Sequence, residues 1–375
     1  MAGCKEFDLN ELLGGKGMTY ERVSGKDFLN RVLAGTATGI IVGILPNAVL
    51  SSILKIFGNN SLALLIGQSV TIFQIATPLI IGALIAHQFK FAPLDMAIVS
   101  GAAYVGSGVT KFNPAIINPI TEKPGMFISA GTGDLINTMI TASLAIGLTY
   151  LFGSRLGSLK IVLAPIIIGG GSGLVGLLIL PFVSKITTTI GDLINSFTTL
   201  QPFLMSALIA MFFSVLIISP ISTVAIGLAI QLNGVSAGAA AMGVAATTIV
   251  LVVHSWKTNK SGVTLAIALG AMKMMMPNLF KYPIILLPSL VTALVSSVSV
   301  ALFQISGTPN SAGFGLVGLV GPLTSLDMGP MSINIFMALV SWIIIPTAIA
   351  IVSRFIFEKV FKLYDEKIVF AHQEA

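Results

Sequence analysis

Long apolar runs separated by short polar gaps dominate the chain from about residue 28 onward. A helix that crosses about 30 Å of hydrocarbon needs roughly 20 apolar residues. Runs of about this length lie at residues 32–53, 61–86, 134–152, 161–183, 200–219, 236–254, 282–302 and 335–353. The pattern therefore predicts membrane-spanning helices over most of the chain.

Shorter or interrupted apolar pieces lie between these runs, at residues 92–110, 221–233, 262–278 and 311–325. Backbone that is not helical is tolerated at membrane depth only where protein or a water-filled cavity covers it. We count the first two pieces as crossings and the last two as re-entrant. The sequence thus predicts an all-α polytopic membrane protein with about ten transmembrane helices and re-entrant hairpins in the second half.

Basic residues indicate the orientation of these helices, because loops rich in Lys and Arg stay in the cytoplasm. Arg22 and Arg31 precede the first run, Lys257 follows the run at 236–254, and Arg354 follows the last run. Both termini are therefore predicted to be cytoplasmic, in a bacterial cytoplasmic membrane. The predicted organisation is a cytoplasmic segment at 1–27, a transmembrane domain at 28–355 and a cytoplasmic tail at 356–375, where residues 355–367 can form an amphipathic surface helix.

Composition supports the membrane assignment. Hydrophobic residues make up 55% and charged residues only 9% of the chain, against roughly 25% charged in an average soluble domain. The net charge of +6 comes from residues spread among the polar gaps, which argues for membrane orientation and against nucleic acid as a partner. Cys4 is the single cysteine, so an internal disulfide is excluded.

Glycine-rich stretches match G-x-G-x-x-G twice, beginning at Gly171 and at Gly313. Neither follows a strand in a βαβ unit, so dinucleotide binding is not predicted. The first is typical of close helix packing. The second lies in an apolar piece bracketed by Pro309 and Pro322, which favours a re-entrant hairpin.

Polar residues at membrane depth are costly and therefore candidates for function. Asp134 stands at the start of a predicted helix, and Asn137 lies one turn further on the same face. The pair predicts a polar face that binds a solute. Capping of the helix N-terminus by Asp134 explains its position equally well, and the two roles are compatible.

Repeated Asn-Pro pairs mark the stretch NPAIINP, which contains Asn113 and Asn118. Proline prevents a regular helix there and leaves backbone carbonyls and Asn amides available to a solute. An external loop with ordinary turn chemistry is the alternative.

A third candidate is the broken apolar segment that contains Lys273, Pro277 and Asn278. Interrupted helices are the sequence sign of a transporter binding site, because they combine unwound backbone with polar side chains. The alternative is that Lys273 extends to the membrane interface. Ser219, Ser222 and Thr223 surround Pro220 and can line a cavity.

Catalytic chemistry has no support in the sequence. The histidines stand apart at His87, His254 and His372, and they form no constellation with carboxylates or serines. His254 precedes Trp256, which favours an interfacial residue over a proton relay. We therefore predict no catalytic residue, no metal site and no cofactor.

The stretches TPNSAGFGLVGLVGPLTSL and KMMMPNLFKYPIILLPSLVTA, together with the order of spans, resemble the membrane-embedded IIC subunits of the sugar phosphotransferase system. The resemblance is strongest to the branch that includes the perfringolysin O regulator family. It implies a homodimer that binds a sugar between a scaffold part and a moving part. Separate IIA and IIB proteins would supply the phosphoryl group, since no phosphoryl-carrying residue is evident on this chain.

The chain departs at two motifs from the sugar-specific IIC subunits of the glucose superfamily. The resemblance implies a Glu-Pro pair where the second-half hairpin approaches the sugar, and a Gly-x-His-Gly type stretch earlier in the chain. The nearest places here contain Met276, Pro277 and Asn278, and Ser219, Pro220, Ile221 and Ser222. A carboxylate that accepts hydrogen bonds from sugar hydroxyls is therefore missing.

The sequence predicts a transport subunit that binds and translocates a sugar or a related small polar solute. Its predicted binding residues are Asp134, Asn137, Asn113, Asn118, Lys273 and Asn278. Since Lys273 is the cation among them, a sugar acid is one candidate solute. The alternative hypothesis is a membrane-embedded ligand sensor or regulator without net transport, and an integral membrane enzyme is a more distant third.

Overall fold

The computed structural model describes residues 23–54, 60–119, 121–309, 311–328 and 335–372. Within these residues, six helices are long and apolar enough to cross a membrane, or seven if a bent pair at 61–88 forms one span. This confirms a polytopic, mainly helical membrane protein. About ten spans and the re-entrant hairpins stay predictions. Most of the predicted N-terminal segment lies outside the described residues.

The described residues form two compact units. Unit 1 is drawn from Met1–Gly43 and Phe73–Val183, and unit 2 from Ile44–Ile72 and Ser184–Glu374. The elements of unit 1 are α2 (Gly25–Leu54, whose end belongs to unit 2), α4 (Thr77–Gln88), α5 (Pro93–Gly106), β1 (Thr110–Ile117), β2 (Pro124–Ser129), α6 (Leu135–Phe152), η2 (Gly157–Leu159), α7 (Lys160–Ala164), η3 (Pro165–Gly170) and α8 (Gly171–Phe197, which also continues into unit 2).

Glycines let the helices of unit 1 approach backbone to backbone. On α2, Gly35 and Gly39 face α4: an added Cβ would lie 2.5 Å from the Cα of Ile85 at Gly35, and 2.6 Å from the Cα of Ile81 at Gly39. Lipid tails are as apolar as leucine, so association of helices in a membrane depends on such close contact. This spacing of four residues keeps both glycines on one face of α2.

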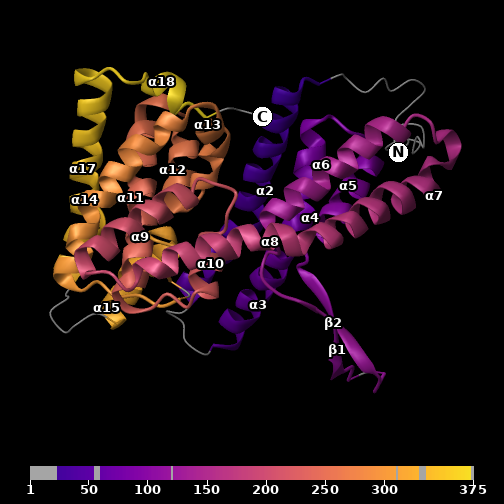
Figure 1. The fold of residues 1–375 in the computed structure, drawn as a ribbon, viewed down its shortest axis with the longest axis horizontal. Helices are drawn as coiled ribbons and strands as arrows, with labels where there is room; N and C mark the ends of the chain where they lie inside the picture. The colour runs from indigo at the N-terminus through magenta and orange to yellow at the C-terminus, as the bar shows by residue number, and fades with distance from the viewer. Residues whose placement is uncertain (1–22, 55–59, 120, 310, 329–334, 373–375) are drawn as a thin grey trace, which may run out of the picture. The chain divides into compact units, whose positions relative to one another are not determined.

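A β-hairpin in unit 1 is the main departure from an all-helical fold. Strands β1 and β2 pair antiparallel, with Thr110 opposite Ser129 and Phe112 opposite Phe127. The sequence predicted a crossing at 92–110 followed by a loop, but α5 ends at Gly106 and the chain then forms strands. Figure 1 shows the hairpin extending away from the helices of this unit.

Unit 2 contains most of the broken helices. Its elements are α3 (Ser61–Ile75), α9 (Pro202–Leu216), α10 (Thr223–Ala229), α11 (Gly234–Thr258), α12 (Ser261–Leu269), η4 (Met272–Met275), α13 (Met276–Lys281), η5 (Pro283–Ile285), α14 (Leu286–Phe303), η6 (Val317–Leu319), α15 (Val320–Met328), α16 (Ile335–Leu339), η7 (Val340–Ile344), α17 (Ile345–Arg354), η8 (Phe355–Val360) and α18 (Glu366–Val369).

Helix α11 is the centre of unit 2, where it packs against α9, α14 and α17 (Figure 1). Its first half is almost entirely Ala, Gly, Ser and Val, and nearly all of its residues are buried. A Cβ at Gly243 would lie 2.1 Å from the carbonyl oxygen of Ala210 on α9. Small side chains thus allow other backbone to lie directly against this helix.

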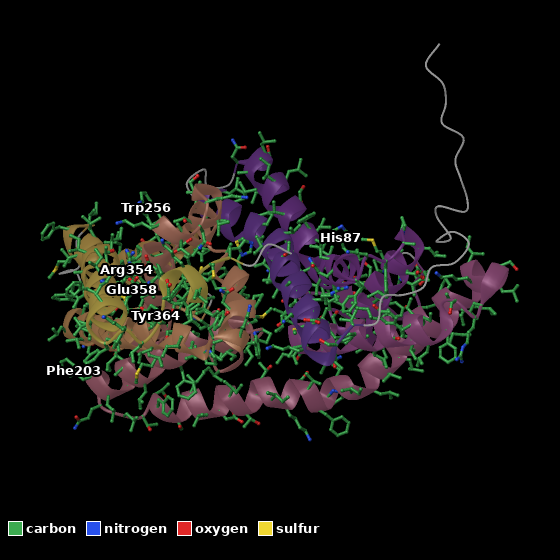
Figure 2. All side chains as sticks on the ribbon, turned by 90° about the horizontal axis from the view of Figure 1, so that it is seen from above. His87, Phe203, Trp256, Arg354, Glu358 and Tyr364 are labelled. Carbon is green, nitrogen blue, oxygen red and sulfur yellow. The ribbon has the colours of Figure 1, made fainter. Side chains whose placement is uncertain are left out.

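The outer surface of unit 2 is apolar. Figure 2 shows Phe203 and Trp256 at its periphery, and these side chains are 53% and 74% exposed. A soluble protein rarely exposes many large apolar side chains, whereas lipid covers them in a membrane protein. This surface agrees with the spans that hydropathy predicts.

The glycine contacts of unit 1 lead to a stability prediction. A Cβ at Gly106 would lie 2.2 Å from Thr141 Oγ1, whereas a Cβ at Gly101 on the same helix has nothing within 4 Å. We expect Gly106→Ala to lower the free energy of unfolding by about 1–3 kcal/mol through overpacking. Gly101→Ala should leave it unchanged or raise it slightly, because alanine favours a helix. Thermal unfolding of the detergent-solubilised variants measures both, and equal melting temperatures would contradict the contact.

Candidate functional site

The break after α9 exposes backbone carbonyls inside unit 2. Helix α9 ends at Leu216, and Pro220 provides no N–H to continue a helical ladder. Ser219 stabilises the turn locally, since its Oγ donates to the carbonyl of Leu216 at 2.7 Å and accepts from the N–H of Ile221 at 3.2 Å. The carbonyls of Ser219 and Ile221 therefore need donors from elsewhere.

Lys273 supplies these donors. Its Nζ donates to the carbonyl of Ser219 and, at 2.9 Å, to the carbonyl of Ile221. The residue is only 8% exposed. It lies in η4, directly after α12 stops at Gly270, whose φ of +133° is accessible mainly to glycine. The break between α12 and α13 thus places a cation against the break after α9.

A third non-helical stretch reaches the same region. Thr223 Oγ1, at the start of α10, donates to the carbonyl of Gly313 at 2.9 Å. A Cβ at Gly313 would lie 2.4 Å from the backbone nitrogen of Val224, so only glycine fits there. We refer to Ser219, Ile221, Thr223, Lys273 and Gly313 together as the junction. It joins three interruptions in the helices of unit 2.

The chemistry of the junction is that of a fixed cation among main-chain carbonyls. An ammonium group has three N–H donors, and the two carbonyls use two of them. The third donor can bind a further acceptor. Exchange of a carbonyl for a solute oxygen would retain the hydrogen bonding of Lys273. The arrangement can therefore bind hydroxyl, carboxylate or phosphate oxygens.

Asn278, on the same broken segment, faces the C-terminal residues instead. Its side chain is buried, and its Nδ2 donates to the carbonyls of Val369 and Ala371, both at 2.8 Å. The structure thus brings Lys273 and Asn278 into one short segment but gives them different partners.

In unit 1, Asp134 and Asn137 form the start of α6. Asp134 Oδ1 accepts from the backbone N–H of Asn137 at 2.9 Å, which is the geometry of an N-terminal cap. Asn137 is fully buried, and its Nδ2 donates to the carbonyls of Gly106 at 2.5 Å and Gly176 at 2.8 Å. These contacts connect α5, α6 and α8.

The hairpin holds the two remaining predicted residues. Asn113 Oδ1 accepts from the N–H of Ala115 at 2.9 Å, and Asn118 Oδ1 accepts from the N–H of Thr121 at 3.2 Å. Such short-range bonds are ordinary turn chemistry. The six predicted residues therefore fall into three places: the start of α6, the hairpin and the broken segment of unit 2.

Several features of the site do not follow from sequence reasoning. The sequence drew attention to Ser219 and Thr223 around Pro220, but not to Lys273 as the donor to that turn. The sequence likewise did not indicate that His254, beside Trp256, is fully buried and contacts Tyr364. Both differences arise from contacts between residues 50 or more positions apart, which leave no periodic pattern in the sequence.

Interrupted helices that meet at a buried polar side chain are a common feature of membrane transporters. The family model described as "Phosphotransferase system, EIIC" matches residues 30–370. The chain therefore belongs to this family of membrane permease subunits for sugar transport. No curated protein and no solved structure matched the chain.

The role of Lys273 at the junction can be tested by stability. Lys273→Met removes the donor of two partly buried carbonyls, and each unsatisfied group costs about 1–3 kcal/mol. Part of this cost is offset because a buried charge is also removed. We expect a net loss of about 1–3 kcal/mol. Lys281→Met, on the same segment but exposed, is the control. Intrinsic fluorescence during thermal unfolding gives the comparison, and a Lys273→Met variant that melts with the control would remove Lys273 from this role.

Proposed function

We propose that the chain binds a sugar or sugar acid at the junction of unit 2 and carries it across the membrane by alternating access. Separate IIA and IIB proteins would supply the phosphoryl group, because this chain has no evident phosphoryl-carrying residue. The observation that carries the proposal is the buried Lys273 ammonium among three helix breaks. Membership of the EIIC family supports the transport role.

The chemistry of the junction favours an acidic solute. The side-chain groups of the junction are one ammonium group, from Lys273, and two hydroxyl groups, from Ser219 and Thr223, and their acceptors are main-chain carbonyls. A carboxylate would receive a charge-assisted bond from Lys273, about twice as strong as a neutral one. The carbonyls of Ser219 and Ile221 would then accept bonds from solute hydroxyls. A sugar acid offers both groups in one molecule.

The proposal assigns the direct solute contact to Lys273. Asn278, Asn137 and Asp134 are assigned supporting roles, because each bonds backbone groups in the described structure. Asn113 and Asn118 would shape the hairpin through their turn contacts.

Assembly and orientation complete the proposal. We expect a homodimer in a bacterial cytoplasmic membrane, with about ten spans and both termini in the cytoplasm. The resemblance to IIC subunits supports the dimer. The basic residues that flank the apolar runs support the orientation.

Uptake into proteoliposomes tests the transport role. Purified protein would be exposed to labelled glucose, gluconate and glucuronate, with and without phosphoenolpyruvate and a cytosolic phosphotransferase extract. We expect uptake of a sugar acid in preference to glucose. Lys273→Met should reduce that uptake about tenfold or more, since a charge-assisted bond is worth about 1.5–3 kcal/mol. Lys281→Met should transport as the unmodified protein does.

Two results would contradict the proposal. Sugar-acid uptake that Lys273→Met leaves unchanged would exclude the junction as the binding site. If glucose, gluconate or glucuronate raised the melting temperature of the protein but none was taken up, the protein would be a ligand sensor and not a transporter.

A further inference from the structure

The chain after η8 folds back onto the end of α11. Residues 361–372, here called the C-terminal strap, include α18 and contact α11 and α13. The sequence predicted a surface helix at 355–367, whereas the structure has η8 to Val360, an extended stretch and the short α18. The strap is held by buried polar contacts, and buried polar groups keep their partners because each loss is costly.

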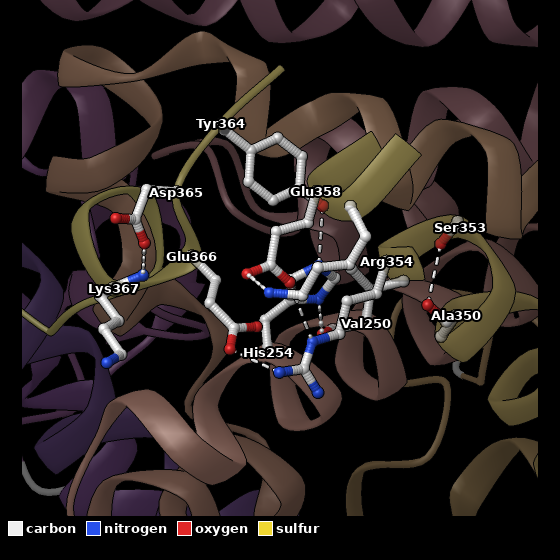
Figure 3. A network of polar contacts seen from close by, with 11 residues as sticks. Val250, His254, Ala350, Ser353, Arg354, Glu358, Tyr364, Asp365, Glu366 and Lys367 are labelled. Atoms are coloured by element: carbon white, nitrogen blue, oxygen red, sulfur yellow. Dashed lines mark hydrogen bonds and ion pairs between the residues drawn. The ribbon is translucent and has the colours of Figure 1, made fainter. Parts of the chain in front are cut away.

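His254 anchors the first half of the strap. Its Nδ1 lies 2.8 Å from the carbonyl of Val250, and since a carbonyl only accepts, Nδ1 carries the proton. Nε2 therefore accepts from the hydroxyl of Tyr364 at 2.8 Å (Figure 3). Burial and the carboxylates of Glu358 and Glu366 raise the pKa of Tyr364 above its usual value, so its hydroxyl keeps the proton that it donates.

An ion pair and a ring contact complete this anchor. The guanidinium of Arg354, at the end of α17, pairs with the carboxylate of Glu366 (Figure 3). The ring of Phe370 stacks on the imidazole of His254 with centroids 4.0 Å apart. Both ring systems are almost fully buried.

Two asparagines hold the second half of the strap by its backbone. Asn259 donates from Nδ2 to the carbonyl of Phe370 at 2.8 Å and accepts from the N–H of His372 at 2.6 Å. Asn278 donates to the carbonyls of Val369 and Ala371. The strap is thus bonded to α13 through Asn278, and to the end of α11 through Asn259.

Asn278 and Lys273 stand five residues apart in two consecutive short helices, the 3-10 helix η4 and the α-helix α13. Gly270, at φ +133°, precedes this segment, and Tyr282 and Pro283 follow it. The segment is therefore bonded at one end to the break after α9 and at the other end to the strap. The segment is held at both ends by these bonds, so the latch requires a shift at Asn278 to be transmitted along η4 and α13 to Lys273.

We propose that the C-terminal strap is a latch that positions Lys273 at the junction. While the strap is docked, Asn278 holds the segment 272–281 so that Lys273 reaches Ser219 and Ile221. Undocking of the strap frees the segment and withdraws the ammonium. Asn278 is a positioning residue in this scheme. The claim that the junction binds a solute rests on the proposed function. The claim that the strap positions Lys273 does not.

Hydrogen–deuterium exchange tests whether the strap is coupled to residues 272–281, with a substitution made in the strap itself. Tyr364→Phe removes the hydroxyl bonded to His254 without touching residues 272–281. We expect exchange in the strap and in residues 272–281 to accelerate together by about tenfold, because one lost buried hydrogen bond shifts a local opening equilibrium by roughly that factor. Ile368→Ala, an exposed strap residue, is the control and should leave both regions unchanged.

Asn278→Ala tests the link itself. We expect the strap to become more sensitive to trypsin at Lys362 and Lys367. We also expect faster exchange at residues 217–223, which include three residues of the junction. Accelerated exchange of the strap alone in Tyr364→Phe, with residues 272–281 protected as in the unmodified protein, would overturn the latch. These measurements do not depend on transport. The latch can therefore be disproved while sugar-acid uptake is observed, and uptake can be absent while the latch is confirmed.

Discussion

Unit 2 depends on finding donors for the backbone carbonyls that its helix breaks expose. An unpaired peptide group costs far more in hydrocarbon than in water, because no solvent molecule replaces the missing partner. Lys273 meets this requirement for Ser219 and Ile221 from more than 50 positions further along the chain. The same bonds bring a charge into the interior of the unit. The Lys273 side chain thus satisfies two backbone carbonyls and is also the group to which we assign solute binding.

The central helix makes such an arrangement possible. Because α11 carries small side chains over its first half, neighbouring backbone lies directly against it. A Cβ at Gly238 would lie 1.9 Å from the carbonyl oxygen of Ile305, and Gly234 pairs with Gly307 through two 3.0 Å hydrogen bonds. Larger residues on α11 would keep the segment before the junction residue Gly313 further away. The close approach of backbone to α11 therefore allows the backbone hydrogen bonds between Gly234 and Gly307, and these bonds in turn hold the two segments together.

Hydropathy predicts the long helices well, since burial in lipid requires about 20 apolar residues in sequence. The run at 134–152 corresponds to α6, Leu135–Phe152, and the Asp134 cap was one of the two predicted roles for that residue. The strap and the junction could not be predicted. Contacts such as that of Asn278 with Val369 join a side chain to backbone 91 positions away, and backbone groups are the same in every residue. The Asn-Pro pairs indicated a turn but not the strands around it.

The hairpin at 110–129 also indicates where the neighbouring ends of α5 and α6 lie relative to the bilayer. A two-stranded ribbon leaves hydrogen-bonding groups on its outer edges, and such edges cannot lie in lipid hydrocarbon. The ribbon connects the last turn of α5 to the first turn of α6. We therefore expect both turns, and with them the Asp134 cap at the start of α6, at one water boundary of the bilayer.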